Sequence, residues 1–126
     1  MEQTYLIDTN VIIDNFGNKL PPNAKAFLNL LDPIVSAVTK IEVLGWLNAT
    51  EKQLQPLYDF MEIASILPIN EAIIDKTITL RQGKRIALGD AIIAATALTY
   101  DLTIITNNEK DFTNIQGLKV INPYSL

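Results

Sequence analysis

Residues 5–13 have the sequence YLIDTNVII, in which an apolar run leads into three polar residues and then a second apolar run. The apolar run Tyr5–Ile7 is typical of a short buried strand. Asp8–Asn10 follow at once and predict a turn or the start of a helix, which Val11–Ile13 then continue. A buried strand that passes directly into a helix is the repeating unit of a parallel α/β sheet.

The same alternation continues along the chain. Further strands are expected at residues 34–38, 65–69, 102–105 and 118–121, and helices at 22–31, 39–47, 51–64, 71–83 and 91–98. The last of these helices has small residues on nearly every side, which indicates that it is buried. We therefore expect one domain over residues 1–126, an α/β/α sandwich with a mainly parallel central sheet.

The composition removes several kinds of chemistry. The 126 residues include no cysteine and no histidine. A cysteine nucleophile, a Ser-His-Asp triad, a histidine base and a His/Cys zinc site are therefore excluded. Carboxylate, hydroxyl, lysine and arginine chemistry remains, with or without a hard metal ion.

The net charge of −4, from 14 acidic and 10 basic residues, argues against a broad basic face for nucleic acid. A single cluster of four carboxylates could account for the whole excess, and a divalent metal would neutralise it. The charge therefore weakens a nucleic-acid interpretation without excluding it. Asp14, Glu71 and Asp75 are expected to be ordinary surface acids.

No segment predicts membrane association. Met1–Thr4 lacks the basic region of a signal peptide, and the most apolar segment, Ala91–Leu98, is far shorter than the ~20 residues that span a bilayer. We expect a cytoplasmic protein with no membrane partner.

Four acidic residues share one kind of position: each follows a predicted strand or opens a predicted helix. They are Asp8, Glu42, Asp90 and Asp111. Ligands of open α/β sheets bind beyond the carboxyl ends of the strands, where these side chains could converge. An all-oxygen cluster suits Mg²⁺ or Mn²⁺, and such a site catalyses phosphodiester hydrolysis by metal-activated water.

Each acid also has an ordinary structural interpretation. Asp8 and Asp90 could cap the helices that follow them. Thr39 and Glu42 have the spacing of a capping box. Asp111 lies in a polar loop where turn residues are common. These alternatives remain open at this level.

Four blocks of sequence, in order, resemble the PIN-domain family and especially its VapC-like toxins. They are LIDTNVIID at 6–14, TKIEVL at 39–44, LGDAIIAATA at 88–97 and IITNNEKDF at 104–112. The resemblance covers nearly the whole chain. It implies a metal-dependent ribonuclease that uses Mg²⁺ or Mn²⁺ and has an acidic site at the strand ends.

The resemblance also implies roles for individual residues. Asp8, Glu42 and Asp90 resemble the family's metal ligands. Asp111 resembles the fourth acid, although in some members that acid lies nearer the position of Asn107.

Thr9 and Thr106 resemble the small hydroxyl residues that flank such sites. Arg81, Lys84 and Arg85 precede the Asp90 block and are candidates for contacts with RNA phosphates. The alternative for these three is a solvated helix end, where basic side chains complement the helix dipole.

For partners, the resemblance implies an RNA substrate, a homodimer and a small cognate antitoxin that covers the active site. Phe27, Leu44, Trp46 and Leu47 could supply such contacts, or they could belong to the core. Two functions remain: a toxin ribonuclease, and a catalytically silent PIN-fold module that regulates through protein contacts.

Overall fold

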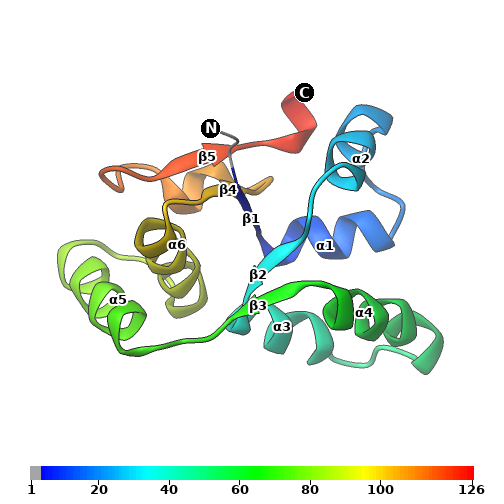
Figure 1. Ribbon diagram of the computed structural model, residues 1–126, viewed down its shortest axis with the longest axis horizontal. Helices are drawn as coiled ribbons and strands as arrows, with labels where there is room; N and C mark the ends of the chain where they lie inside the picture. Colours follow the sequence, from blue (N-terminus) through cyan, green and yellow to red (C-terminus); the bar gives the residue numbers. More distant parts are fainter. Residues whose placement is uncertain (1–3) are drawn as a thin grey trace.

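A computed structural model describes residues 4–126 and shows the expected alternation of strands and helices (Figure 1). Residues 1–3 lie outside the described residues, and the expectation of no signal peptide rested partly on them. In chain order the elements are β1 (Tyr5–Ile7), α1 (Thr9–Phe16), α2 (Pro22–Asn29), β2 (Ile34–Ser36), α3 (Ala37–Leu44), α4 (Glu51–Ile63), β3 (Ser65–Leu67), α5 (Glu71–Gly83), α6 (Leu88–Tyr100), β4 (Thr103–Ile105), η1 (Glu109–Phe112), β5 (Lys119–Ile121) and η2 (Pro123–Ser125).

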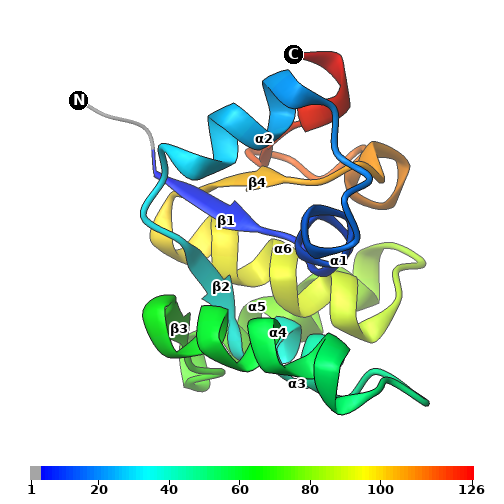
Figure 2. The same ribbon diagram turned by 90° about the vertical axis from the view of Figure 1, so that its right-hand side faces the viewer.

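The strands pair in parallel throughout residues 4–126. β4 lies between β1 and β5, with Leu6 opposite Ile104 and Ile104 opposite Val120. β2 pairs with β3 in a separate ladder and lies beside β1 (Figure 2). The prediction of a mainly parallel sheet is therefore confirmed. Its hydrogen bonds form two separate ladders, one with β1, β4 and β5 and one with β2 and β3.

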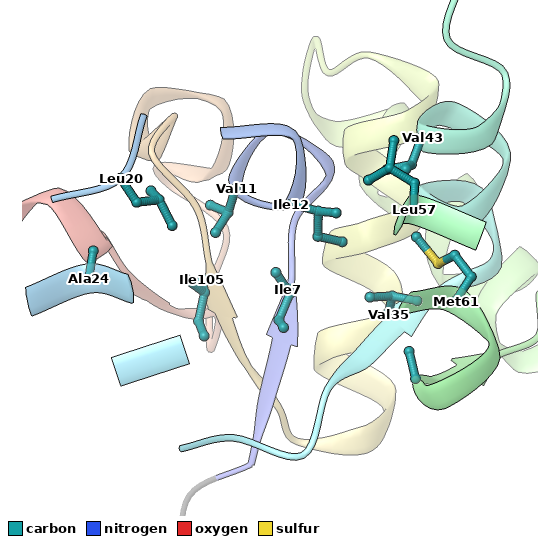
Figure 3. Close-up of a cluster of buried hydrophobic side chains, with 11 residues drawn as sticks. Ile7, Val11, Ile12, Leu20, Ala24, Val35, Val43, Leu57, Met61 and Ile105 are labelled. Carbon is teal, nitrogen blue, oxygen red and sulfur yellow. The ribbon is translucent and has the colours of Figure 1, made fainter. Parts of the chain in front are cut away.

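Helices cover both faces of the strands, which gives the predicted sandwich. α5 and α6 lie on one side, and α1, α2 and α4 on the other (Figure 1). Neighbouring strand residues point to opposite faces: Leu6 packs into the core cluster under α6, and Ile7 packs with Val11 and Ile12 of α1. Figure 3 shows this second cluster, which extends to Leu57 and Met61 of α4.

The small-residue helix α6 is buried, as predicted. Its inner residues run from Ala91 to Ala97 and include Ile93 and Thr96, and the helix packs against α5 on one side and the strands on the other. Within residues 4–126, no helix is long and apolar enough to cross a membrane.

Two predicted helix starts are wrong, and both errors concern site residues. α3 begins at Ala37 because Ser36 caps it, so Thr39 is not the N-cap and the predicted capping box with Glu42 does not form. α6 begins at Leu88, so Asp90 lies inside its first turn and is not the cap. In addition α3 ends at Leu44, and the predicted extension to residue 47 does not occur.

Candidate active site

Asp8 lies where β1 passes into α1, and its carboxylate is held from three sides. Oδ1 accepts the N–H of Thr9 at 2.8 Å, so Asp8 does cap α1. Oδ2 accepts the hydroxyl of Thr106 at 2.7 Å and the amide of Asn10 at 3.2 Å. Burial raises the pKa of Asp8, and the hydrogen bonds from Thr106 and Thr9 oppose that rise.

Glu42 reaches the same region from the second turn of α3. Its Oε1 accepts the hydroxyl of Thr9 at 2.7 Å, and Thr9 also lies 3.1 Å from the hydroxyl of fully buried Thr39. Thr9 has only one hydroxyl proton, and the shorter contact to a carboxylate is the stronger one. Thr39 can therefore donate to Thr9, which donates to Glu42.

Asp90 approaches from the first turn of α6. The preceding residue, Gly89, lies so close to Glu42 that a Cβ there would be 3.0 Å from Glu42 Oε2. This close approach explains a glycine within the first turn of a helix. Burial raises the pKa of the Asp90 carboxyl to about 6, with the charge of Asp111 as the next cause. Asp8 and Glu42 contribute to this pKa in the same direction.

Asp111 is exposed and lies in η1, the short helix that replaces the predicted turn. Its charge raises the pKa of both Asp90 and Asp8, so it lies within electrostatic range of them. Asp8 and Asp90 therefore both lie within range of the charges of Glu42 and Asp111, and the four acids come from separate parts of the chain.

Asn107, the alternative position for a fourth acid, points to another partner. Its amide donates to Asp14 Oδ2 at 2.7 Å, and the hydroxyl of Tyr124 donates to the same oxygen at 2.7 Å. The prediction that Asp14 is an ordinary surface acid is therefore wrong: it is half-buried and joins three segments. The hydrogen bond to Asp14 raises the pKa of the Tyr124 hydroxyl above its usual 10.0.

Two of the three basic candidates have partners within the chain. The guanidinium of Arg81 donates to the carbonyl of Ile86 at 3.3 Å, and the ammonium of Lys84 donates to the carbonyl of Thr113. Arg85 is exposed in the segment before α6. These contacts tie the segment ahead of Asp90 to its surroundings, and they leave the prediction of RNA contacts untested.

Three residues near the cluster were not predicted: Asn10, Thr39 and Gly89. Asn10 is the second side-chain donor to Asp8, and its own Oδ1 is buried with no hydrogen-bond partner. The sequence signals were a polar residue two positions after the acid, a threonine one turn before Glu42, and a glycine next to Asp90.

A comparison with known families decides where this arrangement belongs. A model of the PIN domain matches residues 5–118, a range that contains all four acids. The chain belongs to the PIN-domain family. The fold and the order of the blocks expected from the sequence are confirmed by this match.

Two curated relatives of this PIN domain match over almost their entire length. "Ribonuclease VapC" of Rickettsia bellii (strain RML369-C) is 32% identical, covering 92% of this chain and 93% of the relative. "tRNA(fMet)-specific endonuclease VapC" of Shigella flexneri is 27% identical, covering 91% and 94%. Within the family, this PIN domain is therefore VapC-like.

A solved structure, the "Toxin-antitoxin complex from Klebsiella pneumoniae", contains a similar chain. It is 34% identical, has a TM-score of 0.80 and covers 96% of this chain and 98% of that one. The PIN domain described here thus shares both its architecture and about a third of its aligned residues with a chain of that complex.

The donor set of the acidic cluster fits a hard divalent cation, because every side chain offers oxygen ligands and none offers sulfur or imidazole. No three acidic side chains in residues 4–126 are placed to hold one ion at the same time. The charges of these acids can raise the pKa of Asp90 from several ångströms away, whereas a Mg²⁺–oxygen bond is about 2.1 Å long. Coordination by three of these acids at once would therefore need side-chain rotation, and Asp90 is partly exposed and Asp111 exposed.

Proposed function

We propose that this PIN domain is a Mg²⁺- or Mn²⁺-dependent endoribonuclease and the toxin of a toxin–antitoxin pair. One observation carries the proposal: the carboxylates of Asp111, Asp8 and Glu42 lie close enough to Asp90 that their charges add to the effect of burial, and together these raise the pKa of Asp90 to about 6. Such mutual repulsion is unfavourable for folding, and a bound cation would relieve it. The VapC-like relationship supplies the substrate class, RNA.

Asp8, Glu42 and Asp90 would hold the ion, with Asp111 joining directly or through water. When bound, the ion supplies Lewis-acid stabilisation of the phosphate charge and a nucleophile from water at neutral pH. The chain has no histidine that could serve as a general base instead.

Hydrogen bonds from neighbouring side chains orient the carboxylates of Asp8 and Glu42, which would help them bind the ion. Thr106 and Asn10 orient Asp8 Oδ2, and Thr9 orients Glu42 Oε1. Hydrogen bonds to a carboxylate favour its ionised form, which a metal ligand must have. Asp90 ionises at about pH 6, so it is available as a ligand at neutral pH.

The direct test is cleavage of total cellular RNA by metal-stripped protein supplied with Mg²⁺ or Mn²⁺. The wild type should give discrete fragments, and EDTA should abolish them. Asp8→Asn should be inactive with either ion, because it replaces a charged ligand by a neutral amide of the same shape. Asp75→Asn, which changes an exposed acid on α5, is the matched control and should cleave normally.

Full cleavage in EDTA would contradict the metal-dependent mechanism. No cleavage by folded wild-type protein that is free of antitoxin would favour the second interpretation, a catalytically silent module that acts through protein contacts. Circular dichroism of each variant separates loss of the site from loss of the fold.

The surface between α1, α2 and α4 suits an antitoxin segment with an apolar face and acidic flanks. A groove of about 580 Å³ is lined by Phe16, Leu28 and Phe60 and has Lys25 at its edge. A second groove, of about 360 Å³, shares Phe16 and is bordered by lysines at positions 19 and 52. We propose that the antitoxin occupies these two grooves.

The four apolar candidates for antitoxin contacts separate into two pairs. Phe27 packs edge-on against Tyr5, with ring centroids 5.3 Å apart, and Leu44 packs against the core. Trp46 lines the smaller groove and Leu47 is 81% exposed, so this second pair is available to a partner.

Phe16→Glu tests the groove, because it places a charge between the two cavities. We expect it to abolish co-purification with the antitoxin encoded beside the gene while RNase activity persists. Stable complex formation by Phe16→Glu would contradict the docking proposal and leave the nuclease proposal intact.

We further propose a homodimer. Ile74 and Ile78 lie one turn apart on α5 and are 41% and 50% exposed, so they form an apolar strip on the outer helix. Sedimentation of the wild type should give a dimer and Ile78→Glu a monomer. A monomeric wild type at micromolar concentration would contradict this proposal.

A further inference from the structure

The C-terminal turn reaches back to the loop that carries part of the acidic site. Asn122 Oδ1 caps η2 by accepting the N–H of Tyr124 at 3.0 Å. Tyr124 then donates its hydroxyl to Asp14 Oδ2 at 2.7 Å, and the amide of Asn107 donates to that same oxygen at 2.7 Å. Three segments that are far apart in the sequence therefore meet at one carboxylate oxygen.

Two carboxylates of the β1–α1 segment hold two neighbouring residues of the loop. Asp8, the N-cap of α1, accepts from Thr106, and Asp14, near the end of α1, accepts from Asn107; both distances are 2.7 Å. The loop backbone between these residues is thus fixed relative to α1. Asp111 follows within the same loop.

A second contact joins the C-terminal segment to the far part of the loop. The amide of Asn122 donates to Glu109 Oε1 at 2.8 Å. Glu109 opens η1, which contains Asp111 and ends at the buried Phe112. Residues 122–124 therefore hold the loop on both sides, through Asp14 at its start and through Glu109 at η1.

We propose that Tyr124 and Asp14 are positioning residues that fix loop 106–112, and with it Thr106 and Asp111, for binding of the divalent ion. This inference rests on the proposed metal-dependent function. The family match covers residues 5–118, so Tyr124 lies beyond the matched range.

Tyr124→Phe tests the inference, because it removes one hydroxyl and leaves the ring. Tyr100→Phe is the matched control: Tyr100 is as exposed as Tyr124, and its hydroxyl accepts one hydrogen bond, from Asn70, at the far end of α6. In metal-free protein, amides of residues 106–112 should exchange about three- to tenfold faster in Tyr124→Phe, as expected for loss of one hydrogen bond. Amides within α6 should not change.

Calorimetric titration with Mg²⁺ and Mn²⁺ provides the second readout. Tyr124→Phe should weaken ion binding by about three- to tenfold, and the control should bind like the wild type. In an Asp14→Ala background, which keeps a good helix former in α1, Tyr124→Phe should have no further effect, because the acceptor is already gone.

Unchanged exchange in the loop, or faster exchange with undiminished ion binding, would overturn the inference. Full additivity of the Asp14 and Tyr124 effects would do so as well. If the wild type binds the ion but cleaves no RNA, the proposed function fails while these measurements still decide the positioning role.

Discussion

Replacing Asp90 with asparagine should stabilise the metal-free protein at neutral pH. Burial raises the pKa of this carboxyl, and the charges of Asp111, Asp8 and Glu42 raise it further, from 3.8 to about 6. A carboxyl whose pKa is higher in the folded chain than in the unfolded chain binds more protons when folded. Folding therefore becomes less favourable as pH rises from about 4 to about 6.

The rise in pKa sets the size of the effect. A change from 3.8 to about 6 corresponds to about 3 kcal/mol if the charge were unscreened. Asp90 is partly exposed, so solvent screens part of this. We expect Asp90→Asn to increase the free energy of unfolding by about 1–2 kcal/mol near pH 7, because it removes the charge and keeps the shape.

Urea unfolding in EDTA, near pH 7 and near pH 4, measures this difference. The advantage of Asp90→Asn should nearly vanish at the lower pH, where the wild-type carboxyl is protonated, and Asp75→Asn should match the wild type at both. Added Mg²⁺ should stabilise the wild type more than Asp90→Asn. Equal stability near pH 7, or a gain of the same size at both pH values, would refute the reasoning.

Two further substitutions probe the support of the cluster. Thr106→Val removes the 2.7 Å hydrogen bond to Asp8 Oδ2 and should lower the free energy of unfolding by about 1.5–3 kcal/mol, whereas Thr106→Ser should retain it; equal urea midpoints for both variants would contradict this. Gly89→Ala places a Cβ 3.0 Å from Glu42 Oε2 and should weaken Mg²⁺ activation about tenfold. Gly83→Ala is the control, because a Cβ there has nothing within 4 Å, and it should leave the Mg²⁺ dependence of cleavage unchanged. A wild-type Mg²⁺ dependence in Gly89→Ala would show that the added Cβ does not displace Glu42.

Short-range patterns predicted the fold well because burial decides it. In a domain of this size, apolar runs such as Tyr5–Ile7 are removed from water only when they lie between two layers of helices. The small residues on nearly every side of α6 likewise predicted its burial. The four acids were singled out from their positions at strand and helix ends.

Helix starts were harder to predict because several residues compete for the cap. Ser36 and Thr39 are both good N-cap residues, and Ser36 is the cap because it lies directly at the end of β2. That choice leaves Thr39 inside α3, where it meets Thr9. The contacts of Asp14 with Asn107 and Tyr124 join residues about 90 and 110 positions apart, and no local pattern could reveal them.

The structural alternatives for the acids bear on function. Asp8 does cap a helix, but neither Glu42 nor Asp90 caps one, and Asp111 is exposed on the short helix η1. Folding alone therefore gives no reason to place Glu42 and Asp111 where their charges raise the pKa of Asp8 and Asp90. A silent binding module would gain stability by losing one of them, whereas a metal-dependent nuclease needs all of them ionised at one point. If Asp90→Asn is more stable than the wild type but inactive, the negative charge of Asp90 lowers the stability of the fold and is required for catalysis.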